Sequence, residues 1–196
     1  MIADKILTVD GARALIFDCD GTLVDSMPLH MRAWRYAFDQ IKAVYDEEFL
    51  LSAKGMKETE IIELYNRYHK TSLDPLKTVR IKHDYFCKHI ENVRTIPVVA
   101  DIAKQYHRRL PLAVVSGSPK KIVHKELKIT GLLGLFDLIL TADDPFKPKP
   151  APDIFLEAAR RLGITPEFCL VFEDGDAGLE AAVKAGMRTA DIRLYI

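Results

Sequence analysis

The chain has 196 residues, enough for one domain or for one core with a small insertion. Hydrophobic residues make up 48% and charged residues 29%, which is typical of an ordinary globular protein. Lysine plus arginine and aspartate plus glutamate number 28 each, which excludes a global charge that would favour nucleic acid or an anionic membrane.

Three cysteines, Cys19, Cys87 and Cys169, offer neither a metal-binding spacing nor an even set for disulfides. The first residues contain acids and no long apolar stretch, so they do not resemble a signal peptide. No apolar run approaches the ~20 residues of a membrane helix. We therefore expect a cytoplasmic protein, a monomer or weak dimer, without nucleic-acid or membrane partners.

The first predicted element is a strand over residues 14–17, where an unbroken apolar run is typical of a strand buried on both faces. Asp18 follows it, at the carboxyl end where open parallel sheets bind ligands. Asp20 lies two residues further and points the same way, and Gly21 allows the chain to turn. Carboxylates this close favour a cation between them, and Mg2+ suits oxygen ligands. The alternative is an ordinary surface turn, which Asp and Gly also form.

Residues 28–95 carry only helical patterns, and we expect helices that begin near residues 28, 57 and 75. Ser26 or Asp25 is a suitable cap for the first of them. Pro28 and Pro97, at the two ends of this segment, stiffen the chain where it leaves the rest of the protein and where it returns to it. We therefore predict a helical domain over residues 28–95 and an α/β core formed by residues 1–27 and 96–196.

After a helix predicted over residues 98–106, an apolar run indicates a second buried strand that ends at Ser116. Gly117 and Ser118 follow, and Pro119 then begins a helix whose first amides are free to hold an anion. These hydroxyls and amides suit a phosphate cradle, although the same residues would also serve as a plain helix cap.

A third strand is expected over residues 136–141, and a proline-rich loop follows it. Lys149 stands between two prolines of this loop, which preorganises its charge for a phosphoryl oxygen. Lys147 repeats the Lys-Pro pair, but we expect its side chain to be solvated.

A fourth buried strand over residues 168–173 ends in Glu173 and Asp174, with Asp176 close behind. These acids could act at a site or could simply favour the positive end of the next helix. Residues 188–194 are expected to supply a fifth strand. Buried strands that alternate with helices predict a doubly wound, Rossmann-like parallel sheet in an α/β protein.

The four segments that contain Asp18, Ser116, Lys149 and Glu173 resemble the motifs of the haloacid dehalogenase superfamily of phosphohydrolases, and they occur in the same order. The resemblance implies that Asp18 is the nucleophile and that Asp20 is the general acid and base. It also implies that Ser116 and Lys149 hold the transferred phosphoryl oxygens. The Mg2+ ligands implied by the resemblance are Asp18, the Asp20 backbone carbonyl and Asp174, with Glu173 in support.

The helical insertion resembles the cap domain of β-phosphoglucomutase-like members, and the end of the chain looks most like bacterial fructose-1-phosphate/6-phosphogluconate phosphatases. His30 opens a His-x-x-Ala-Trp pattern that also begins such caps, where the histidine contacts substrate. A lone histidine or a helical lysine is more often a surface residue. The substrate-binding residues that we expect are Thr22, His30, Lys57, Lys82, Gly117 and Ser118.

The expected reaction is Mg2+-dependent hydrolysis of a small sugar phosphate, such as fructose 1-phosphate, through an aspartyl phosphate on Asp18. Two alternatives are a phosphosugar mutase and a noncatalytic binding module on the same fold. In β-phosphoglucomutase a cap arginine grips a distal phosphate, whereas this chain has Glu58 at or beside that place. Because a glutamate repels phosphate, we expect hydrolysis rather than interconversion of sugar phosphates.

Overall fold

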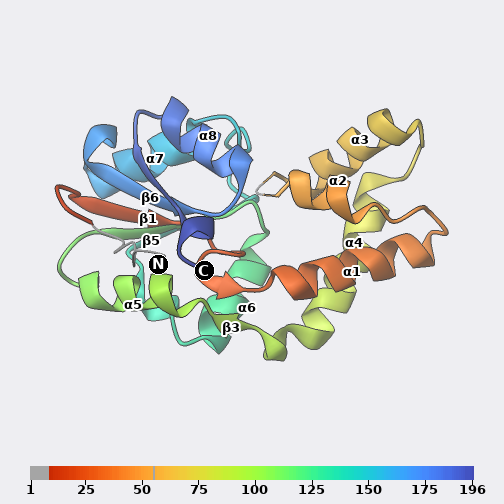
Figure 1. Ribbon diagram of the computed structural model, residues 1–196, viewed down its shortest axis with the longest axis horizontal. Coiled ribbons are helices and arrows are strands. Elements are labelled where there is room, and N and C mark those ends of the chain that lie inside the picture. The colour runs from red at the N-terminus through yellow and green to blue at the C-terminus, as the bar shows by residue number, and fades with distance from the viewer. Residues whose placement is uncertain (1–8, 55) are drawn as a thin grey trace, which may run out of the picture.

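The computed structural model describes residues 9–54 and 56–196, and a parallel sheet of five strands forms its centre (Figure 1). The strand order is β5-β4-β1-β6-β7, so the direction of winding reverses between β1 and β6. Such a switch point is where open α/β sheets bind ligands, at the carboxyl ends of the strands. The strands are β1 Ala14–Phe17, β4 Leu112–Val115, β5 Leu138–Leu140, β6 Cys169–Glu173 and β7 Arg188–Asp191.

The register of the central strands brings their carboxyl ends level. Phe17 of β1 lies opposite Val114 of β4 on one side and opposite Phe172 of β6 on the other. Residues that follow these three positions therefore emerge at one edge of the sheet. The predicted doubly wound parallel sheet is confirmed.

Helices cover both faces of the sheet, and the strand residues alternate between them. Leu15 and Phe17 pack into the core that includes Val99 of α5, whereas Ala14 and Ile16 pack on the opposite face. This alternation explains why an unbroken apolar run is needed in β1. The covering helices are α5 Pro97–Tyr106 and α6 Lys120–Ile129 on one face and α7 Asp153–Leu162 and α8 Asp176–Lys184 on the other (Figure 1).

A separate group of helices, here called the helical region, lies beyond the carboxyl edge of the sheet (Figure 1). Trp34, Phe38 and Tyr65 are buried in its own small core. Its chain leaves and returns through a short antiparallel ribbon of two strands. The elements are α1 Met27–Gln40, α2 Glu47–Ser52, α3 Glu58–His69 and α4 Pro75–His89, with β2 Val24–Asp25 paired to β3 Arg94–Thr95.

Among the local departures from the sequence prediction, three concern α2, the start of α1 and the last strand. Helix α2 was not predicted because six residues are too few to show a helical period, although Asp46 caps it through the Phe49 amide. Ser26 stands at the start of α1 without capping it by its side chain. The last strand ends at Asp191 rather than 194, because Asp191 accepts the Arg193 amide and starts a 3-10 turn.

Short 3-10 turns complete the described secondary structure: Ile90–Asn92, Leu133–Leu135, Pro166–Phe168 and Ile192–Leu194. None of the helices within residues 9–54 and 56–196 combines the length and hydrophobicity needed to cross a lipid bilayer.

Candidate active site

Asp18 occupies the position directly after β1, at the centre of the carboxyl edge. Its backbone amide donates to the Phe172 carbonyl, which continues the pairing of β1 with β6. Carboxylate oxygens of Asp18, Glu173 and Asp174 lie within 4.8 Å of one another, and all three side chains are buried. The end of β6 and the residue after it therefore bring their acids against Asp18 after β1, although at least 155 positions separate them in the sequence (173 − 18 = 155).

Lys149 forms ion pairs with two of these acids, Asp18 and Glu173. Its ammonium donates to Asp18 Oδ1 at 2.8 Å, to Glu173 Oε2 at 2.7 Å and to the Val115 carbonyl at 3.1 Å. Burial by itself would lower the pKa of Lys149, but Asp18 and Glu173 raise it above its ordinary value. Lys149 is therefore a fixed positive charge beside Asp18.

The acid cluster remains short of positive charge. Burial raises the pKa of Asp18 well above its ordinary value, and Glu173 adds to the rise, whereas Lys149 opposes it. Such a set of buried carboxylate oxygens fits a hard cation, and Mg2+ keeps water or phosphate oxygens among its ligands. The described residues that would hold it are Asp18 and Asp174, with Glu173 tied to Lys149.

Two glycines leave room for these acids. Gly21 has a φ of +82°, and a β-carbon there would collide with the Asp174 carboxylate. A β-carbon at Gly178 would collide with the Glu173 carboxylate. Any larger residue at either position would therefore displace an acid of the cluster.

Asp20 is held by neighbours at the start of α1 and in the loop after β4. Its Oδ1 accepts from the Ser26 hydroxyl at 2.6 Å and lies 2.7 Å from His30 Nε2, while its Oδ2 accepts from the Ser118 hydroxyl at 2.8 Å. Burial would raise the pKa of Asp20, but His30 and the two hydroxyls lower it well below the ordinary value. The side chain is thus an ionised carboxylate in this arrangement, held in place by these three contacts.

Ser116 lies beside this group rather than pointing freely into the cavity. Its hydroxyl is 3.5 Å from Asp20 Oδ2 and accepts the Ser118 amide at 3.0 Å. Gly117 and Ser118 line the central cavity together with Asp18 and Asp20. The loop after β4 therefore reaches the same place as the loop after β1, as the parallel register requires.

His30 links Asp20 to the helical region. Its Nδ1 lies 2.6 Å from the Lys82 ammonium, which is a donor only, so Nδ1 accepts and Nε2 carries the proton that faces Asp20. Burial and the Lys82 charge lower the pKa of His30, which favours this neutral form. The order of contacts runs from Asp20 through His30 to Lys82.

Lys82 is fully buried, contrary to the usual place of a helical lysine. Besides His30 it contacts Glu58, and its ammonium lies 5.3 Å from the ring centroids of both Trp34 and Phe86. The other carboxylate oxygen of Glu58 contacts His83 Nε2. His30 and Lys82, each predicted from the sequence to bind substrate, are therefore part of one buried network inside the helical region.

Other predicted substrate residues lie in different surroundings. Thr22 is fully buried, and its hydroxyl donates to Asp174 Oδ1 at 3.2 Å, so it supports an acid of the cluster. Lys57 is exposed and borders a second, smaller cavity next to Ser116 and Lys149. Lys147 borders this second cavity too and is exposed, as expected.

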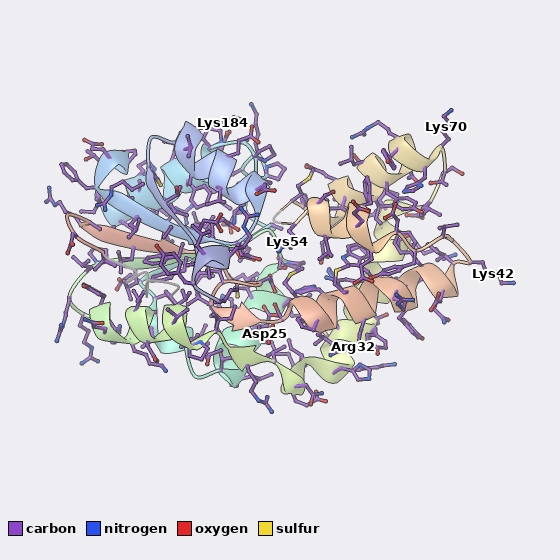
Figure 2. All side chains as sticks on the ribbon, viewed as in Figure 1. Asp25, Arg32, Lys42, Lys54, Lys70 and Lys184 are labelled. Atoms are coloured by element: carbon purple, nitrogen blue, oxygen red, sulfur yellow. The ribbon has the colours of Figure 1, made fainter. Side chains whose placement is uncertain are left out.

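The sequence prediction did not single out Ser26 or Lys54 as site residues, and it considered Glu58 only for its place at or beside the cap arginine of β-phosphoglucomutase. Lys54 lies between the sheet and the helical region in Figure 2, and its ammonium donates to Asp174 Oδ2 at 2.9 Å. A β-carbon at Gly175 would lie 3.2 Å from the Lys54 carbonyl, so the two loops are packed closely. The signal that could have identified Lys54 is its place in the loop that precedes the second predicted helix.

The central cavity is lined by residues at the carboxyl ends of β1, β4 and β6 and by residues of the helical region. Its volume is about 60 Å³, well below the ~300–1,000 Å³ of common ligand pockets. A ligand of that size does not fit the cavity in this arrangement of the helical region.

Comparison with known proteins agrees with this geometry. Residues 15–192 match the family described as haloacid dehalogenase-like hydrolase. The chain is 38% identical over 181 residues to fructose-1-phosphate phosphatase YqaB of Escherichia coli (strain K12), covering 92% of this chain and 96% of that protein. It is 29% identical to 6-phosphogluconate phosphatase of the same organism, covering 89% of this chain and 79% of the relative.

A solved structure of β-phosphoglucomutase from Clostridium difficile has the same fold, with a TM-score of 0.80 and 27% identity over 92% of this chain and 84% of that one. The resemblance predicted from the motifs is thereby confirmed, and the names of the relatives agree with the predicted enzyme class, phosphoric monoester hydrolase. This chain belongs to the haloacid dehalogenase-like hydrolases.

Proposed function

We propose that the protein is a Mg2+-dependent phosphatase that hydrolyses a small sugar phosphate through a covalent phosphoaspartate. The observation that carries the proposal is the position of Asp18. Its carboxylate lies at the sheet edge, within 2.8 Å of the Lys149 ammonium and within 4.8 Å of the Glu173 and Asp174 oxygens, with Asp20 at the same cavity. These are the parts that phosphoryl transfer to a carboxylate requires.

In the first step the Asp18 carboxylate attacks phosphorus, and the bond from phosphorus to the sugar oxygen breaks. Because the contacts in this structure hold Asp20 ionised, it must take up a proton before this step, and it then gives that proton to the leaving oxygen. Lys149 stays beside the reacting carboxylate and balances charge on the transferred oxygens. A Mg2+ ion, when bound by Asp18, Asp174 and the Asp20 carbonyl, would supply further charge neutralisation for the phosphate.

In the second step a water molecule replaces the sugar. Asp20, now a carboxylate, removes a proton from the water, and the water oxygen attacks phosphorus while the bond to Asp18 breaks. The contacts from Ser26, His30 and Ser118 keep Asp20 ionised and fix the direction of its carboxylate. Inorganic phosphate leaves, and both carboxylates return to their starting state.

We propose that the helical region, residues 28–95, forms a cap domain over the carboxyl edge of the sheet. The small cavity and the paired strands β2 and β3 support a hinge at this ribbon, since opening there would move all four helices together. Closure would exclude water during the first step and would return His30 to Asp20.

A cytoplasmic location and a monomer or weak dimer remain proposals as well. All three cysteines are free, which agrees with a reducing compartment.

A second candidate is a phosphosugar mutase, because the structural likeness to β-phosphoglucomutase extends over most of both chains. A mutase would convert β-glucose 1-phosphate to glucose 6-phosphate when primed with catalytic glucose 1,6-bisphosphate. We expect instead that inorganic phosphate appears and that little glucose 6-phosphate forms. Faster formation of glucose 6-phosphate than of free phosphate would establish the mutase and reject the phosphatase.

The metal requirement is tested on a chromogenic aryl phosphate with and without Mg2+. We expect activity to depend on Mg2+ and the Asp174→Ala variant to need at least about tenfold more of it, because an anionic ligand is lost. An unchanged Mg2+ titration in this variant would move the metal away from Asp174. Complete inactivity of the parent chain with Mg2+ would favour the noncatalytic module.

A further inference from the structure

Two cavities meet at the loop after β4. Gly117 lines both the central cavity and the smaller second cavity. Asp18 and Asp20 line the central cavity, whereas Ser116 and Lys149 line the second one. A phosphoryl group held by Asp18, Ser116 and Lys149 would therefore lie where the two cavities adjoin. Asp20, which serves the sugar oxygen in the proposed reaction, is on the side of the central cavity.

Two exposed lysines also line the second cavity. Lys57 directly precedes α3 in the helical region, and Lys147 belongs to the proline-rich loop after β5. The acid among the described residues of this lining, Asp144, already accepts the amide of Thr141 at 2.8 Å and its hydroxyl at 3.2 Å. The cavity therefore has two ammonium groups at its solvent side and the buried Lys149 at its inner end.

The central cavity is less suited to an anion that leaves the site. Its helical side is mainly apolar, and the Lys54 ammonium there is already bound to Asp174 at 2.9 Å. A phosphate dianion that loses its water needs other polar partners, because burial without them is costly. The second cavity offers such partners. The apolar residues on the helical side of the central cavity are Met27, Met31, Trp34, Leu50, Met56 and Ile61.

The second cavity is narrow in this structure. Its volume is about 20 Å³, which is enough for a water molecule and too little for phosphate. A lysine carries its ammonium on a flexible stem of four carbons, and the side chains of Lys57 and Lys147 are exposed. Rotation of these two side chains would widen the cavity toward solvent without any movement of the helical region.

We propose that inorganic phosphate leaves through the second cavity, and that Lys57 and Lys147 form a transient binding site for the phosphate dianion on this route. The inference rests on the proposed phosphatase function and adds the path of its product. It gives Lys57 a different role from the substrate binding expected from the sequence, because the sugar phosphate enters on the central side. By reversibility, phosphate from solution enters the site along the same route.

The test follows inorganic phosphate labelled with a heavy oxygen isotope, in ordinary water with Mg2+. In the reverse of the second step, an Asp18 oxygen bonds to phosphorus, and one labelled hydroxyl oxygen leaves as water after taking a proton from Asp20. Hydrolysis then supplies an unlabelled oxygen from the solvent. Each bound phosphate either repeats this exchange or leaves, so the ratio of repeated exchange to release measures how slowly phosphate leaves.

The decisive variant combines Lys57→Gln with Lys147→Gln. We expect its ratio of repeated exchange to release to rise by about threefold or more, because the departing anion no longer meets the two ammonium groups on its route. Mass spectrometry of the phosphate isotopologues measures this ratio whichever step limits turnover. A ratio equal to that of the parent would overturn the inference.

The matched control combines Lys88→Gln with Lys128→Gln, which removes the same charge from exposed lysines of α4 and α6. Its isotope ratio should equal that of the parent. Both double variants should have the same kcat/KM for fructose 1-phosphate, since the sugar phosphate enters on the central side. If the variant at Lys57 and Lys147 had a lower kcat/KM than the control and an unchanged isotope ratio, these lysines would bind substrate and the inference would be wrong.

Ala142→Leu provides a test that leaves both lysines in place. Ala142 lines the second cavity, so a larger side chain there narrows the route without changing any charge. We expect the isotope ratio to rise by about threefold or more here too, and an unchanged ratio in the folded variant would overturn the inference. Failure of the proposed function looks different, because the parent enzyme would then neither hydrolyse fructose 1-phosphate nor exchange phosphate oxygen.

Discussion

Two groups of buried charges face each other across the cavity, and they differ in their balance. At the sheet edge, Asp18, Glu173 and Asp174 share the ammonium of Lys149, with Lys54 reaching Asp174 from the helical region. In the helical region a single carboxylate, Glu58, has Lys82 on one oxygen and His83 on the other.

The comparison shows that the neighbouring charges decide how a buried carboxylate behaves. Burial and neighbouring acids raise the pKa of Asp18, so the sheet edge favours an added cation. Burial would also raise the pKa of Glu58, but Lys82 and His83 lower it to about 2, so this site favours no added cation. The first group is suited to chemistry, and the second to holding a fixed shape and a fixed charge.

The largest expected effect follows from removing the nucleophile at the sheet edge. Asp18→Asn should lower the steady-state rate by about 10⁴-fold or more, because an amide cannot attack phosphorus. The matched control is Asp25→Asn, which changes an exposed acid seven residues further along the chain (25 − 18 = 7) and should keep the parent rate. Phosphate release by Asp18→Asn within tenfold of the parent would refute the nucleophile assignment.

The next effect separates the roles of the two acids in the first loop. Asp20→Asn should lose general acid help, worth about 10²–10⁴-fold, on a sugar phosphate, whose leaving group is poor. The loss should be smaller for the first step with an aryl phosphate, whose leaving group needs little protonation. Rapid-quench measurement of both esters checks this, and full activity on the sugar phosphate would exclude Asp20 as the acid.

Breaking the charge balance between Lys82 and Glu58 should mainly lower the stability of the protein. Lys82→Met leaves the Glu58 carboxylate buried without its ammonium, which should lower the free energy of unfolding by about 3–5 kcal/mol. Lys88→Met changes an exposed lysine of the same helix and should stay within about 0.5 kcal/mol of the parent. Urea unfolding of both variants measures the difference, and equal midpoints would show that the buried pair contributes nothing.

The smallest effect is a pH dependence of that stability. Because the pKa of Glu58 is lowered from 4.5 to about 2, its contribution is present above pH 4.5 and is lost as pH falls toward 2. Between pH 5.5 and 3.5 the parent should lose about 1 kcal/mol more unfolding free energy than Glu58→Gln loses. Urea unfolding at several pH values measures this, and parallel losses in both proteins would contradict the lowered pKa.

The sequence alone was enough to predict the sheet and the position of its acids. The apolar runs before Asp18, Ser116 and Glu173 are local signals in the sequence. A strand buried on both faces needs such a run, whichever helices pack against it. Their order along the chain places the carboxyl ends of the strands at one edge, because right-handed crossovers leave few other topologies. The family resemblance came from the same short segments.

Only the tertiary structure decided which side chains meet across the cavity. A lysine at 82 looks like any helical lysine in the sequence, and its burial against His30 depends on how α1 and α4 pack. Likewise the Lys54 contact with Asp174 joins residues 120 positions apart. Such contacts depend on how elements that are distant in sequence pack together, and a local pattern of residue types carries no information about that packing.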